Sequence, residues 1–267
     1  MEYISTRNKE KTFSFKEVFL KGLAPDGGLF VPKKIPIIDS QELLNFKNLS
    51  YNQLAAKIIF KFCSDEFKEE EIQEIVNNSY KKFRTKNVVE IQKLNGVHLL
   101  ELFYGPTLAF KDIVMQVIGN MYKKIIKKNN LKINVIVATS GDTGAAAISA
   151  IKDKENMKIF VLHPYKKISE VQRKFMTTVN SSNVFNIALA GNFDECQKFV
   201  KSMFLNKNFC SSISMSGVNS INWSRIAIQI VYYFFSYLKI AKNNEEINFS
   251  VPTGNFGDIY AGYMAKK

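Results

Sequence analysis

Beyond residue 130 the chain alternates between short runs rich in β-branched residues and stretches with helical spacing. The runs lie at 133–137, 158–162 and 183–189, and a fourth is expected near Ile247. Strands that alternate with helices pair in parallel, because each helix carries the chain back to the edge where the next strand begins. The pattern therefore predicts an α/β fold with an open parallel sheet built from βα units. Ligands of such sheets bind at the carboxyl ends of the strands.

The two ends of the chain follow a different pattern. Residues 1–95 are expected to be mainly helical, and the apolar spacing of helices covers 41–63 and 66–83. The apolar stretch 226–240 is interrupted by polar residues and is too short to cross a bilayer, so we interpret it as a buried helix.

Composition limits the class of protein. A length of 267 residues with 46% hydrophobic residues allows one or two domains with a substantial core. The formal net charge of +13 comes mainly from lysines that are scattered along the chain. We interpret this charge as a feature that favours solubility and attracts anionic metabolites, and we expect no nucleic-acid partner. The N-terminus lacks the apolar core of a signal peptide, and we expect no membrane partner.

Cysteine and histidine usage argues against a metal site. Cys63, Cys196 and Cys210 lie far apart, and the only histidines are His98 and His163. This spacing predicts neither structural zinc nor a disulfide framework, and it fits a reducing, cytoplasmic compartment. The sequence also lacks the Walker motif, the G-x-S-x-G motif and the H-E-x-x-H motif.

Lys111 lies in a segment that indicates an activated amine. The dipeptide Gly105-Pro106 predicts a turn, since proline presets φ and glycine tolerates the bend. Ile113, Val114 and Val117 follow at helical spacing, so Lys111 is expected at the start of a helix among apolar residues. Desolvation favours the neutral amine, which forms Schiff bases with carbonyl groups such as that of pyridoxal phosphate. The alternative is a surface lysine whose stem covers apolar residues.

A glycine-containing segment, 254–258, indicates a phosphate site. It follows an apolar run and precedes a helix, where backbone N–H groups and the helix dipole attract phosphate. Gly254 and Gly257 allow close backbone approach or positive φ. A phosphate bound here and a carbonyl bound at Lys111 would be two ends of one ligand; an ordinary βα turn is the alternative. The similar segment 191–195 carries acidic residues, so we interpret it as a helix cap.

Two more segments offer polar groups to an anion. Thr139, Ser140 and Thr143 surround the start of an alanine-rich helix, where hydroxyls and free N–H groups form an anion pocket, with simple capping as the alternative. Arg225 follows a stretch rich in amides that begins at Asn219. Arginine binds phosphate through two parallel hydrogen bonds, although a surface arginine beside a cap explains the same pattern.

Taken together, these segments resemble the threonine synthases, which depend on pyridoxal phosphate and share the fold of the tryptophan synthase β chain (fold type II). The resemblance rests on residues 101–112, 138–146, 219–222 and 254–258, in the order of the family, and on 27–32. It covers essentially the whole chain and is closest to the branch with the enterobacterial and fungal enzymes.

The resemblance implies a function and a set of site residues. A threonine synthase converts O-phospho-L-homoserine and water to L-threonine and phosphate by γ-elimination and β-addition, the last step of threonine biosynthesis. Lys111 would hold the cofactor and move protons at Cα and Cβ of the substrate, and Asp142 would lie near the cofactor ring hydroxyl. The cofactor phosphate would bind the loop of Gly254, Asn255, Phe256, Gly257 and Asp258. The substrate phosphate would bind Thr139, Ser140, Thr143, Asn219 and Arg225, with a further hydrogen bond from Asn222.

The resemblance also implies an organisation. Residues 1–95 would be a helical segment of the large domain, 96–217 the smaller α/β domain with the cofactor lysine, and 218–267 the start of the large α/β domain. Family members continue past Lys267, so we expect a truncated form or fragment that lacks the partner of the pyridine nitrogen, is inactive alone and leaves the 226–240 helix partly exposed. Alternatives are a threonine synthase-like phospho-lyase and an inactive remnant. A monomer or homodimer is expected.

Overall fold

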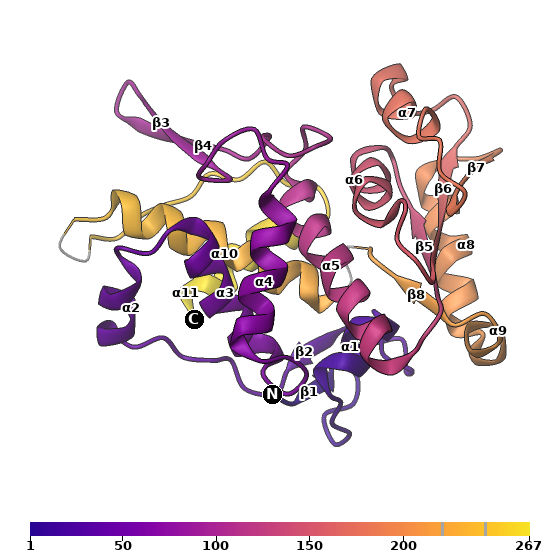
Figure 1. Cartoon of the computed structure of the whole chain (residues 1–267), viewed down its shortest axis with the longest axis horizontal. Helices are drawn as coiled ribbons and strands as arrows, with labels where there is room; N and C mark the ends of the chain where they lie inside the picture. The colour runs from indigo at the N-terminus through magenta and orange to yellow at the C-terminus, as the bar shows by residue number, and fades with distance from the viewer. Residues whose placement is uncertain (220–221, 243–244) are drawn as a thin grey trace.

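The computed structural model describes residues 1–219, 222–242 and 245–267. Ser220 and Ile221, which belong to the motif at 219–222, lie outside the described residues. A helical body and a four-stranded sheet with its own helices lie side by side, and helix α5 (Lys111–Asn129) runs between them (Figure 1).

The sheet is entirely parallel, with strand order β7-β6-β5-β8. Its strands are β5 (Ile133–Ala138), β6 (Met157–Pro164), β7 (Val184–Leu189) and β8 (Met215–Gly217). The expected α/β class is confirmed. The strand expected near Ile247 is wrong, because 247–250 has no strand in the structure and Phe249 packs its ring against Tyr233 of helix α10 (Trp223–Ile240) instead. The fourth strand is β8, whose three residues carry too little pattern to be recognised.

The two faces of the sheet are covered by different helices. Helix α6 (Asp142–Ile151) lies on the face toward α5, and α7 (Glu170–Thr177) packs beside it. Helices α8 (Phe193–Leu205) and α9 (Lys207–Ser212) lie on the other face. Along β5, Val135 and Val137 join the main core, whereas Ile136 and Ala138 join a smaller core beneath α8. Both faces of β5 are therefore apolar, as a buried central strand requires.

The helical body confirms the mainly helical N-terminal part and adds two small antiparallel sheets that we did not expect. Its helices are α1 (Phe15–Lys21), α2 (Ser40–Phe46), α3 (Tyr51–Cys63), α4 (Glu69–Tyr80), α10 (Trp223–Ile240) and α11 (Gly257–Lys266). One sheet pairs β1 (Tyr3–Ser5) with β2 (Phe30–Pro32), which α1 separates in the chain, and the other is the hairpin β3 (Glu90–Leu94)/β4 (Val97–Glu101). The helical stretch 41–63 is two helices, because Ser50 begins a new one through a capping box with Gln53.

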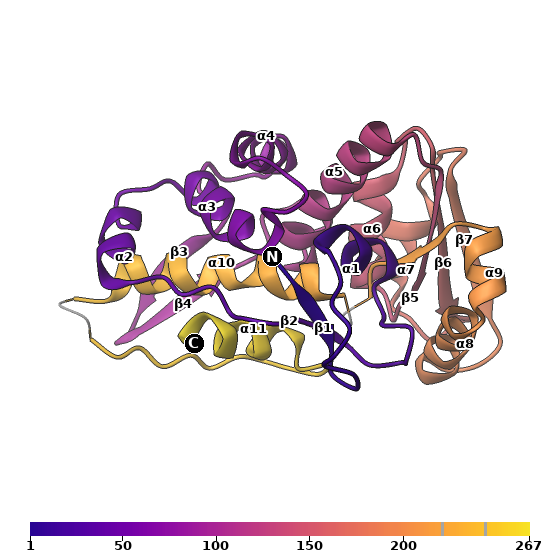
Figure 2. The ribbon, with the colours of Figure 1, turned by 90° about the horizontal axis from the view of Figure 1, so that it is seen from below.

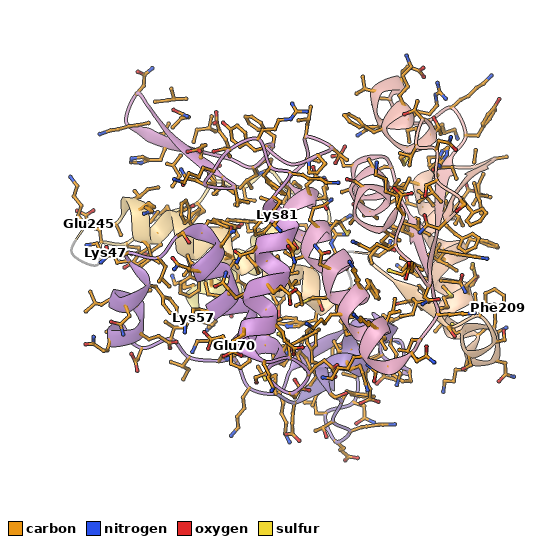
Figure 3. The ribbon with its side chains drawn as sticks, in the orientation of Figure 1. Lys47, Lys57, Glu70, Lys81, Phe209 and Glu245 are labelled. Carbon is orange, nitrogen blue, oxygen red and sulfur yellow. The ribbon has the colours of Figure 1, made fainter. Side chains whose placement is uncertain are left out.

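Helix α10 is the axis of this body. Figure 2 shows it running between α3 and α11, and most of its residues from Trp223 to Tyr233 are buried. The buried helix expected at 226–240 is confirmed. Its expected partial exposure is found only in the second half, where Tyr237, Leu238 and Ile240 are half-buried and Lys239 is exposed. Charged side chains such as Lys57 on α3 and Glu70 on α4 lie on the solvent side (Figure 3). No helix of the described residues is long and apolar enough to cross a membrane.

Close packing of α5 on α6 sets the geometry around the site. A Cβ atom added at Gly119 of α5 would lie 2.5 Å from the carbonyl oxygen of Ala150 and 3.1 Å from its Cβ. One turn earlier, Gln116 Nε2 donates to Ser149 Oγ at 3.2 Å. The two helices run in the same direction, so this contact brings their first residues, Lys111 and Asp142, together.

We expect Gly119→Ala to destabilise the fold by about 1–2 kcal/mol, because overpacking costs about 1–3 kcal/mol and exceeds the gain of about 1 kcal/mol in helix propensity. Urea unfolding measures the change. Lys127→Ala, at an exposed position of the same helix, is the control and should change stability by less than about 0.5 kcal/mol. A Gly119→Ala protein that is as stable as the parent contradicts the close approach.

Candidate functional site

A cavity of about 380 Å³ opens at the carboxyl ends of the sheet strands, a volume within the range of small-molecule sites. Its walls come from the starts of α5, α6, α10 and α11 and from the segments before them. With the exception of Asn222, the residues that the sequence predicted for the site line this cavity: Lys111, Thr139, Ser140, Asp142, Thr143, Asn219, Arg225, Gly254, Asn255, Phe256, Gly257 and Asp258. Segments up to 147 residues apart thus meet in one place.

The segment before Lys111 forms the expected turn, with Leu108 N–H donating to Gly105 O at 3.2 Å. Gly105 is needed because a Cβ there would lie 2.5 Å from Asp112 Oδ2. That buried carboxylate accepts from the Thr107 backbone N–H at 2.7 Å and from its hydroxyl at 2.8 Å. Burial raises the pKa of Asp112, and the Thr107 hydrogen bonds act in the opposite direction. The turn is thereby tied to α5, and Lys111 is the first residue of that helix, as predicted.

Lys111 meets a carboxylate as well as apolar atoms. Its Nζ lies 3.0 Å from Asp142 Oδ2 and 4.2 Å from the centroid of the Phe110 ring. The expected apolar surroundings are therefore confirmed for the Phe110 ring, but the contact with the Asp142 carboxylate was not expected. Asp142 also accepts from Gln172 Nε2 at 2.7 Å. Burial raises the pKa of Asp142, but the hydrogen bonds from Gln172 and Lys111 prevail and hold it below its ordinary value.

The segment after β5 presents both hydroxyls and N–H groups. Thr139 Oγ1 accepts from the backbone N–H of Gly141 and of Gly144, both at 2.9 Å, so its hydroxyl proton remains free to donate. The start of α6 has no side-chain cap at Gly141. Thr139 thus orders the loop, while Ser140 and Thr143 line the cavity. Binding of an anion here stays a prediction.

Arg225 is a buried cation with few partners, so the surface-arginine alternative is wrong. Its side chain is 5% exposed, Nη1 donates to Val218 O at 3.1 Å, and Nε has no partner among the described residues. Burial lowers the pKa of Arg225 to about 10. Asn219 donates to Ala138 O at 3.3 Å, and its Oδ1 finds no partner in the same set. An anion in the cavity would satisfy the guanidinium.

Asn222 does not belong to the site, and its expected hydrogen bond to phosphate is wrong. Its Nδ2 donates to Phe19 O and Gly217 O, both at 3.1 Å, and its Oδ1 accepts from the Ser224 N–H at 3.0 Å. The side chain is fully buried and does not line the cavity. It joins α1, β8 and α10 and so places Arg225.

The segment before α11 presents a helix N-terminus without a side-chain cap. Positive φ at Gly254 or Gly257 is wrong; the left-handed residue is Phe256, with φ of 57°. Nothing lies within 4 Å of a Cβ added at Gly254, which leaves room for close approach of a ligand. The carboxylate of Asp258 is bound by the hydroxyls of Tyr232 and Tyr233.

Sequence reasoning missed several lining residues, namely Phe110, Phe193, Gln197, Gln229 and Thr253. The cap at 191–195 is confirmed, because Asn192 accepts from the Glu195 N–H at 3.0 Å. Gln229 lies one turn after Arg225, and its Nε2 donates to Arg225 O at 2.7 Å. Its helical spacing from the arginine was the only signal that pointed to it.

Comparisons with known proteins point to one family. The family model "Threonine synthase N terminus" matches residues 2–80. Threonine synthase from Pseudomonas aeruginosa is 43% identical over 267 residues, 100% of this chain and 57% of the relative. Threonine synthase-like 2 from Xenopus laevis is 36% identical, with the same coverage. The crystal structure of PLP-bound threonine synthase from Brucella melitensis superposes with a TM-score of 0.91 at 41% identity, covering 100% of this chain and 57% of that one.

The family model covers residues 2–80, whereas the relatives and the solved structure match the whole chain. In sequence and in structure, this chain is similar to the threonine synthases over its whole length, and it spans a little over half the length of the relatives that it matches.

Proposed function

We propose that the chain carries the cofactor site of a threonine synthase, a pyridoxal-phosphate-dependent lyase that converts O-phospho-L-homoserine to L-threonine in the cytoplasm. The observation that carries the proposal is one cavity in which three kinds of group meet: a lysine, a buried arginine whose Nε has no partner among the described residues, and two helix N-termini without a side-chain cap. A ligand with an aldehyde and a phosphate, together with a substrate that bears a second phosphate, uses all of these groups.

The residues present fit pyridoxal phosphate. Lys111 Nζ supplies the amine that binds its aldehyde carbon, and the open backbone at 254–258 suits its phosphate. Asp142, which already bonds Nζ, suits a role beside the ring hydroxyl. Bound in this way, the cofactor supplies an electron sink for the charge that develops at the substrate Cα.

The chain's own groups divide the remaining work. Lys111 would hold and return protons at Cα and Cβ of the substrate. Arg225 binds the substrate phosphate and stabilises its negative charge as it leaves Cγ, because a buried guanidinium that has no carboxylate partner among the described residues interacts strongly with an anion. Thr139, Ser140, Thr143 and Asn219 orient that phosphate with hydroxyl and amide groups.

A threonine synthase-like phospho-lyase is the second candidate, supported by the likeness to threonine synthase-like 2. Such an enzyme would release phosphate without completing threonine, so product analysis separates the two. The higher identity to threonine synthase favours the first candidate. The cytoplasmic location is supported by three free cysteines. The division at residues 95 and 217 and the monomeric or dimeric state stay predictions.

Lys111→Ala is expected to remove the label that borohydride reduction leaves on protein incubated with pyridoxal phosphate. Noncovalent affinity for the cofactor should persist in part, because the segment 254–258 is untouched. Peptide mapping of the reduced parent should place the label on Lys111. Lys166, which also lies over an aromatic ring but is exposed, provides the control, since Lys166→Ala should keep the label. A label on any other lysine refutes the assignment.

In a form of the protein as long as its relatives, Arg225→Ala is expected to reduce kcat/KM for phosphate release from O-phospho-L-homoserine by the equivalent of roughly 2–5 kcal/mol, the range for removing one partner of a buried charge pair. Affinity for the cofactor should change little. Arg173→Ala is the matched control, because Arg173 is exposed and paired with Glu170. A variant that loses cofactor and keeps its substrate affinity would show that the two phosphate sites are reversed.

A further inference from the structure

Asp258 poses an electrostatic problem for a phosphate site at residues 254–258. It is the second residue of α11, where the helix dipole favours an acidic side chain. The same position adjoins the cavity, where a carboxylate directed at a phosphate would repel it. The phosphate site therefore requires that this carboxylate be directed elsewhere.

Two neighbouring tyrosines of α10 bind the Asp258 carboxylate. Tyr232 hydroxyl lies 2.5 Å and Tyr233 hydroxyl 2.8 Å from the same oxygen, Oδ1, and Tyr233 also lies 3.0 Å from the main-chain oxygen of Asp258. Both tyrosines line a second cavity, which shares Asp258 with the first and does not include Lys111 or Arg225. Neither tyrosine lines the cavity that would hold the phosphate.

Packing fixes this arrangement. A Cβ added at Gly262, one turn after Asp258, would lie 2.7 Å from the Tyr233 ring, so the glycine lets α11 lie directly on that ring. Burial raises the pKa of both tyrosines, with the Asp258 charge adding to it, so their hydroxyls remain proton donors. Tyr232 hydroxyl also lies 3.2 Å from Gln229 Oε1, but its single proton goes to the nearer, charged acceptor.

We infer that Tyr232 and Tyr233 are positioning residues that hold the Asp258 carboxylate against α10, so that the start of α11 offers N–H groups and no negative charge to a phosphate. The inference rests on the proposed function, in which residues 254–258 bind the phosphate of pyridoxal phosphate. It adds a buried pair that acts on the ligand only through Asp258.

The test is a titration of the protein with pyridoxal phosphate, followed by absorbance. The double variant Tyr232→Phe/Tyr233→Phe should bind the cofactor more weakly by on the order of 10-fold, because the released carboxylate repels the phosphate. Adding Asp258→Asn to the double variant should restore most of the affinity, and salt should reduce the defect by screening. Tyr263→Phe, on exposed α11 surface, is the matched control.

Two results would overturn the inference. One is a double variant that binds pyridoxal phosphate as tightly as the parent protein does. The other is a loss of affinity that Asp258→Asn does not reverse, which would mean that the hydroxyls act only through packing. Hydrogen exchange without cofactor gives an independent readout. In the double variant, hydrogen exchange should be faster at 257–262 and unchanged at β5 and β6. The unchanged exchange of these strands would also show that the variant folds. If the parent protein binds no pyridoxal phosphate, the proposed function is wrong. In that case, unchanged hydrogen exchange at 257–262 in the double variant separately rejects the positioning role of Tyr232 and Tyr233.

Discussion

The close approach of α5 to α6 is the constraint on which the site depends. Gly119 of α5 lies against Ala150 of α6, and the two helices run in the same direction. Their first residues, Lys111 and Asp142, therefore lie side by side, with Lys111 Nζ 3.0 Å from Asp142 Oδ2. A side chain in place of Gly119 would separate the helices along their whole length, because protein interiors are too densely packed to absorb the extra atoms locally. The same packing fixes how far the sheet lies from the helical body, and so the width of the cavity between them.

Two other devices complete the cavity, and both act from outside it. Asn222 ties α1, β8 and α10 together, which holds the start of α10 and its Arg225 at the sheet edge. Asp112 ties the turn at 105–108 to α5. The side chains of Asn222 and Asp112 are fully buried, and each makes hydrogen bonds to the backbone. The chemistry of the site is therefore carried by residues whose positions are set by a different set of polar residues beneath them.

Local patterns explain what could be predicted from the sequence. The turn before Lys111 follows from Gly105 and Pro106, and the strands β5 to β7 follow from runs of β-branched residues, because both depend on neighbours in the chain. The strand β8 and the bonds of Tyr232 and Tyr233 to Asp258 could not be found in this way, since they are decided by partners distant in sequence. The strand expected near Ile247 failed for the same reason: its apolar residues meet a helix face.

The isolated charge of Arg225 has a consequence for the energetics of the empty protein. Its guanidinium has lost most of its hydration without gaining a carboxylate partner among the described residues, and such a charge lowers the stability of the fold that contains it. A bound anion returns part of this free energy, so ligand occupancy and folding are thermodynamically linked at this residue. The affinity measured for any anion that pairs with Arg225 would therefore include relief of this desolvation cost along with the new contacts.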